Sequence, residues 1–133
     1  MPINPVKNFT SKYTKPLQIL LFLYIIGFTI GTTTHTIDII KGGFLPYNHL
    51  ELWKNIYWTS LTLLDFLAIV LVIYSLVPAL ILANIIMISD VLINTQFLTV
   101  FSHYKLVFQL VFCAYVVIST PFICRKYSFE NHK

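Results

Sequence analysis

Charged side chains are scarce in this sequence. Only 11% of the 133 residues are Asp, Glu, Lys or Arg, whereas about a quarter are charged in a typical soluble domain. Hydrophobic residues make up 57% of the chain, and the mean hydropathy is +0.78. This shortage of charge argues against a soluble fold and places the chain among membrane proteins.

The motifs of common enzyme chemistry are also absent. The sequence has no Gly-x-Ser-x-Gly nucleophile motif, no phosphate-binding loop and no dinucleotide-binding fingerprint. It lacks the His-Glu-x-x-His motif and any paired-cysteine metal motif. His35 and Asp38 have a spacing that could chelate a metal, with Asp65 or Asp90 as further oxygen ligands, but no metal-binding motif supports such a site. We therefore expect no cofactor, no metal and no catalytic residue of a known class, and whether the protein is an enzyme stays open.

Cysteine is rare as well. Cys113 and Cys124 lie on one late apolar run, where a helix would separate them by about 16 Å. That separation is too large for a disulfide within the helix. We expect both thiols to be buried among apolar side chains.

Long apolar runs dominate what is present. Four of them lie near 17–37, 56–77, 79–100 and 104–124. Each would form a helix roughly 31–33 Å long, enough to cross the hydrocarbon core of a bilayer. Backbone polar groups in lipid have to be satisfied within the segment. The runs therefore predict an all-α protein with a four-transmembrane-helix bundle at 17–124, a basic arm at 1–16 and a tail at 125–133.

The polar segments between the runs predict an up-down topology. One outer loop, 38–55, joins the first two spans, and a tight turn at Pro78 joins the second to the third. Another short turn precedes the fourth span. Trp53, Tyr57 and Trp58 follow the outer loop, and we expect them to form an aromatic belt at the membrane interface.

Basic residues predict the orientation of the bundle. The arm and the tail together carry six of them: Lys7, Lys12, Lys15, Arg125, Lys126 and Lys133. The opposite side carries three: Lys41, Lys54 and Lys105. This bias predicts a multi-pass membrane protein with both termini in the cytoplasm. Because the lysines stand beside apolar runs, we expect membrane lipids as their partners and not nucleic acid.

Two aspartates interrupt the spans. Asp65 and Asp90 each lie about 14–15 Å from the outer end of their spans, near the bilayer midplane. An aspartate at that depth costs about 2.5–3.5 kcal/mol on insertion scales, and such residues usually have a function. Antiparallel helices would bring the two carboxyl groups to a similar level, where they could hold a cation or share a proton.

Helical spacing, and for Gln109 its depth in the fourth span, place further polar side chains in the outer half of the bundle interior. The residues that we expect to line an outward-facing ligand-binding pocket are His35, Asp38, Trp58, Asp65, Asp90, Asn94 and Gln109. Fewer polar residues lie in the inner half, so this pocket would end near the midplane. Gly27 and Gly31 form a small-xxx-small face for helix packing. We expect threonines such as Thr32 and Thr36 to satisfy their hydroxyls on their own backbone.

Three sequence blocks suggest a family. GTTTHTIDIIKGG, YWTSLTLLDFLA and IMISDVLIN each centre on an acid, namely Asp38, Asp65 and Asp90. Together they resemble a family of small uncharacterised bacterial four-span integral membrane proteins, over roughly 27–97. The resemblance implies a multi-pass protein of the bacterial cell (inner) membrane and no activity.

Four hypotheses for the function follow. The leading one is a module that binds a small amphipathic or cationic ligand in the outward-facing polar pocket. The alternatives are a proton- or cation-coupled small transporter, perhaps acting as a homo-oligomer, a membrane enzyme with His35 and an aspartate as acid and base, and a structural or partner-binding subunit. The position of His35 relative to Asp65 and Asp90 separates them: a pocket requires that the three groups meet.

Overall fold

The computed structural model describes residues 4–96 and 103–131. Within these ranges the chain is all-helical, without strands, and its helices are α1 (Pro5–Lys12), α2 (Lys15–Gly42), α3 (Leu52–Tyr74), α4 (Leu76–Thr95) and α5 (His103–Asn131). The four longer helices, α2 to α5, are long and apolar enough to cross a membrane. The predicted all-α four-helix bundle of a multi-pass membrane protein is thereby confirmed.

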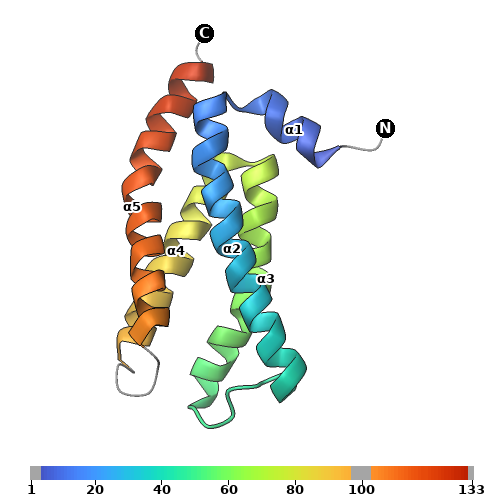
Figure 1. Ribbon diagram of the computed structural model, residues 1–133, viewed down its shortest axis with the longest axis vertical. Helices are drawn as coiled ribbons and strands as arrows, with labels where there is room; N and C mark the ends of the chain where they lie inside the picture. Colours follow the sequence, from blue (N-terminus) through green and yellow to red (C-terminus); the bar gives the residue numbers. More distant parts are fainter. Residues whose placement is uncertain (1–3, 97–102, 132–133) are drawn as a thin grey trace.

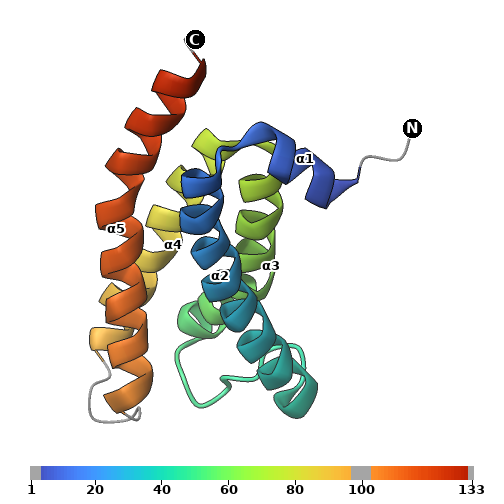
Figure 2. The same cartoon turned by 45° about the horizontal axis from the view of Figure 1, so that its top comes forward.

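The four long helices form a closed ring of neighbours (Figure 1). Each packs on the next along the chain, and α2 also packs on α5. We call one end of the bundle the termini end, because α1 and the end of α5 lie there (Figures 1 and 2). The connector 43–51 lies at the opposite end, which we call the loop end.

Helix α2 continues past the expected end at 37 to Gly42. In its polar last turns the hydroxyls of Thr34 and Thr36 donate to backbone carbonyls four residues earlier, at 2.8 and 2.7 Å, so these polar groups are satisfied within the helix. The helix stops at Gly43, whose φ of 88° lies in the region that only glycine adopts readily. The connector is therefore 43–51, shorter than the loop expected over 38–55.

The turn between α3 and α4 is as tight as expected. Ser75 alone separates the two helices. Pro78 lies in the first turn of α4, where a missing N–H costs no helical hydrogen bond. Helix α4 ends at Thr95, and the part of the expected third span beyond 96 lies outside the described residues, together with most of the turn before α5.

The basic arm contains a helix that the sequence analysis missed. The side chain of Asn4 caps α1 by accepting from two backbone N–H groups. Three side chains of this segment, Asn8, Lys12 and Tyr13, donate to the carbonyl groups at 73, 74 and 72, at 3.2, 2.6 and 3.2 Å. Burial raises the pKa of Tyr13 to about 12, with a further contribution from Tyr127, so its hydroxyl stays a donor. Since the last carbonyls of a helix have no partner of their own, this segment caps α3.

The cysteines differ from expectation. Cys113 is half-buried, but Cys124 is exposed on the outer surface of the bundle. Its neighbour Ile123 is fully buried and Phe122 is exposed. The prediction of two buried thiols is wrong for Cys124, because the lipid-facing side of a membrane helix is as apolar as its core and hydropathy does not distinguish them.

Candidate functional site

Asp90 is held by amide donors from two helices. Its carboxylate is buried, with the residue 7% exposed. Asn94, one turn further along α4, donates to Oδ1 at 2.8 Å, and Gln109 of α5 donates to Oδ2 at 3.0 Å. The side chain of Trp58 on α3 also hydrogen-bonds to this carboxylate. The structure thus brings together four of the residues that were expected to line a site, and both oxygens of Asp90 are satisfied.

Asp65 has the opposite environment. It is 4% exposed on α3, and its carboxylate lies directly against Gly31 of α2, where a Cβ atom would overlap it. No hydrogen bond joins this carboxylate to any of the residues that the structure describes. It lies close enough to Asp90 for the two charges to interact. A largely buried carboxylate without a donor is costly as an anion, so a proton or a cation would stabilise Asp65.

Two buried hydroxyls near this position are also without partners. The Oγ1 atoms of Thr32 and Thr62 are inaccessible and make no hydrogen bond within the described part of the chain. Thr62 lies three residues before Asp65, on the same face of α3. Thr32 follows Gly31 on α2. Thr36 satisfies its hydroxyl on its own backbone, as expected, but Thr32 does not.

His35 and Asp38 meet at a residue that the sequence analysis did not select. The Tyr47 hydroxyl donates to Oδ2 of Asp38 at 2.7 Å and lies 3.1 Å from Nδ1 of His35. Because the Tyr47 O–H donates its hydrogen bond to Asp38, its oxygen can only accept from His35. A neutral His35 ring therefore carries its proton on Nδ1. Burial raises the pKa of Tyr47, and its hydrogen bond to Asp38 adds to this effect, so the hydroxyl remains protonated.

A buried asparagine positions Tyr47. Asn55, near the start of α3, accepts the backbone N–H of Tyr47 at 3.1 Å and donates to the carbonyl of Leu45 at 3.2 Å. These bonds fold the connector back over the bundle. The sequence signal for Tyr47 was a single aromatic hydroxyl in a short connector beside the polar end of α2.

Trp58 links the two polar groups. The rings of Tyr47 and Trp58 meet edge to face, with centroids 5.4 Å apart. Trp58 is 3% exposed, so it belongs to the site and not to the interface belt in which it was also expected. Tyr57, half-buried, bonds to Ser89 at 2.7 Å, whereas Trp53 is exposed at the start of α3. The His35–Asp38 pair and the Asp90 cluster are therefore neighbours through two aromatic rings. Within the described part His35 makes no hydrogen bond to Asp65 or Asp90, so the three groups that the predicted pocket required are not joined directly.

An aromatic layer closes the site toward the termini end. The rings of Phe28 and Phe112 pack edge to face at 5.4 Å. Phe112 fits directly against Gly27, where a Cβ atom would overlap the ring. Gly27 and Gly31 thus both lie at helix contacts, but Gly27 faces α5 and Gly31 faces α3.

On the side of this layer that faces the termini end, the polar side chains hydrogen-bond to one another. The Tyr24 hydroxyl lies 2.9 Å from Ser119 Oγ and 3.2 Å from Thr120 Oγ1, and Asn84 donates to Thr120 at 2.8 Å. Tyr24 also donates to the carbonyl of Val116 at 3.1 Å. Each of these side chains therefore has a hydrogen-bond partner within the cluster, unlike the carboxylate of Asp65 in the described part of the chain.

The fold and the site together define a four-helix membrane bundle with two buried carboxylates in unlike environments. No family model, curated protein or solved structure matches the chain. Among the described residues, no group of three or more His, Cys, Asp or Glu side chains is arranged to hold a metal ion. The function is therefore argued from the chemistry of the site.

Proposed function

We propose that this protein binds a small amphipathic cation, with Asp65 as the counter-charge. One observation carries the proposal: Asp65 is buried without a hydrogen-bond donor in the described part, while Asp90, beside it, is fully supplied. The unpartnered hydroxyls of Thr32, next to Gly31 in α2, and of Thr62, one turn before Asp65 in α3, are candidate further acceptors.

An alkylammonium group fits this chemistry. Its N–H groups can donate charge-assisted hydrogen bonds to the Asp65 carboxylate and further hydrogen bonds to threonine oxygens. The attraction is strong because little water screens it in the bundle interior. The alkyl part of such a ligand would contact apolar side chains. Asp90, fixed by Asn94 and Gln109, adds a second negative charge nearby without moving.

The orientation of the protein is part of the proposal. The excess of lysine and arginine at the termini end supports termini in the cytoplasm, and we propose the bacterial inner membrane on the family resemblance alone. The loop end would then face outward, and a ligand would arrive past Tyr47, His35 and Asp38. Membership of the small bacterial four-span family remains a prediction.

The aromatic layer favours binding over transport. Passage through the bundle would require a polar route from Asp65 to the Tyr24 cluster. The Phe28 and Phe112 rings lie between these two groups of polar residues. A ligand held at Asp65 would therefore leave by the route through which it entered.

The test uses purified protein in detergent and a series of alkylammonium ions. We expect these cations to raise the melting temperature, and alcohols of equal chain length to have little effect. Asp65→Asn, which preserves the shape of the side chain, should abolish the ligand-induced shift. Glu51→Gln is the matched control, because Glu51 is an exposed acid paired with Lys54 at 2.9 Å. Equal shifts in Asp65→Asn and Glu51→Gln, or equal shifts with the alcohols, would refute the proposal.

A further inference from the structure

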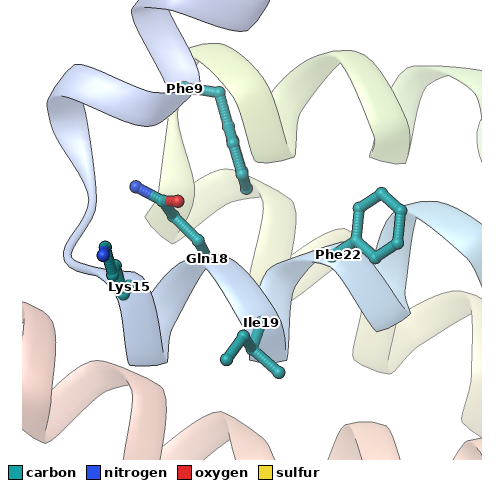
Figure 3. A pocket seen from close by; sticks show the side chains of 5 residues that line it. All are labelled: Phe9, Lys15, Gln18, Ile19 and Phe22. Atoms are coloured by element: carbon teal, nitrogen blue, oxygen red, sulfur yellow. The ribbon is translucent and has the colours of Figure 1, made fainter.

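A second candidate site lies at the termini end, away from the aspartates. A hollow of about 380 Å³ is lined by residues of α1 and the first turns of α2: Phe9, Lys15, Gln18, Ile19 and Phe22 (Figure 3). We propose that this hollow binds an anionic phospholipid of the leaflet at the termini end. The headgroup phosphate would contact Lys15, and an acyl chain would lie along Ile19 and Phe22.

The hollow is built by specific bonds between α1 and α2. The amide of Gln18 donates to the carbonyls of Thr10 and Tyr13, at 3.0 and 2.6 Å. The Phe9 ring packs edge to face on Tyr13, with centroids 5.3 Å apart. In Figure 3, Gln18 lies between Lys15 and the descending side chain of Phe9. Because α1 also caps α3, the walls of the hollow are fixed on both sides.

The charge at this end is complementary to an anionic headgroup. Among the described residues, five basic ones occur here: Lys7, Lys12, Lys15, Arg125 and Lys126. The sequence places a single acid at this end, Glu130. The described residues contain no salt bridge to Lys15. Lys15 is exposed on the first turn of α2, where the positive end of the helix dipole adds to its charge.

The apolar wall favours a lipid over a soluble anion. Ile19 is 67% exposed and Phe22 is 56% exposed, on the first turns of a helix that can span the membrane. A soluble phosphate would leave these side chains uncovered. A phospholipid would cover them with an acyl chain while the lysine extends to the headgroup, the arrangement in which long basic side chains are stable at membrane interfaces.

Native mass spectrometry with equimolar phosphatidylglycerol and phosphatidylcholine of identical chains tests the proposal. We expect phosphatidylglycerol to be retained preferentially. Lys15→Gln should lower its association constant about fivefold, since one basic residue near an anionic surface contributes about that factor. Lys41→Gln is the matched control, because Lys41 is exposed in the last turn of the same helix.

A second pair of variants tests the acyl contact. Phe22→Ala should lower retention of phosphatidylglycerol, and Phe66→Ala should not, although both rings are 56% exposed. Equal retention of the two lipids, or equal effects of Lys15→Gln and Lys41→Gln, would overturn the proposal. So would equal effects of the two phenylalanine variants. Complete displacement by glycerol phosphate would instead identify a site for a soluble anion, which also contradicts it. None of these outcomes depends on Asp65.

Discussion

Replacing Asp65 and Asp90 by asparagine, one at a time, is expected to change stability in opposite directions. The two substitutions preserve shape, so the difference comes from hydrogen bonding and charge. Asp65 has no donor in the described part of the chain, and Asp65→Asn removes an uncompensated carboxylate. Asp90 accepts from two amides, and Asp90→Asn places an NH₂ group against one of these donors.

The magnitudes follow from these environments. An aspartate near the bilayer midplane costs about 2.5–3.5 kcal/mol, of which an asparagine amide retains a part. Asp65→Asn should therefore raise the free energy of unfolding by about 1 kcal/mol. A hydrogen bond to a charged acceptor contributes about 1.5–3 kcal/mol, and the donor left behind is buried. Asp90→Asn should lower the free energy of unfolding by about 2 kcal/mol.

Reversible unfolding in mixed detergent micelles, followed by far-UV circular dichroism, measures both values without added ligand. Circular dichroism is preferable to tryptophan fluorescence, because Trp58 bonds to Asp90 and its signal would change locally. Glu51→Gln controls for the loss of a carboxylate and should change little. A decrease of similar size for Asp65→Asn and Asp90→Asn would refute the reasoning, since the partners of the two carboxylates would then not matter.

Three other substitutions have defined outcomes. Tyr47→Phe preserves the ring on Trp58 but removes the bonds to Asp38 and His35, so limited proteolysis within 43–51 should become faster. Gly27→Ala forces the ring facing it to move, and should lower the free energy of unfolding by about 1–3 kcal/mol. Lys12→Met removes a donor to the end of α3, and should increase hydrogen exchange in the last turn of that helix.

Two of these predictions have a matching control variant, and the third has a defined contradicting outcome. Tyr74 is exposed, with a hydroxyl that no hydrogen bond in the described part involves, so Tyr74→Phe should leave proteolysis of the connector unchanged. Lys41→Met, at the opposite end of the bundle, should not alter exchange in the last turn of α3. Unchanged stability in Gly27→Ala would contradict the close packing of Phe112 on α2.

The bundle and much of the Asp90 cluster follow from simple periodicity. Hydropathy identifies helices that cross lipid, because their backbone bonds are internal and their side chains are apolar on every face. Asp90 and Asn94 are four residues apart on one helix, which makes their contact a local property of the sequence. Gln109 is predicted from its depth in the membrane alone. That depth is sufficient because α4 and α5 are neighbours, so residues at the same level of the two helices can meet.

The features that sequence analysis missed depend on the path of polar segments. Whether Tyr47 reaches Asp38 depends on where the connector folds, which Asn55 determines from a distance of eight residues. Trp53 and Trp58 show the second difficulty: they are 53% and 3% exposed on one helix. In a membrane bundle the core and the lipid-facing surface are equally apolar, so composition does not indicate which tryptophan points inward.

The way the bundle treats its other polar groups strengthens the case for Asp65. At two positions an amide from another helix supplies a donor to a buried acceptor: Asn84 donates to Thr120, and Gln109 to Asp90. The four helices thus provide partners at positions where leaving a polar group unpaired would be costly. At Asp65 they place a glycine instead, whose missing side chain leaves room for the carboxylate and provides no donor. This contrast between Asp65 and the other buried acceptors supports the proposal that Asp65 takes its partner from outside the chain, and an ammonium cation would supply both the charge and the N–H donors that the four helices do not provide there.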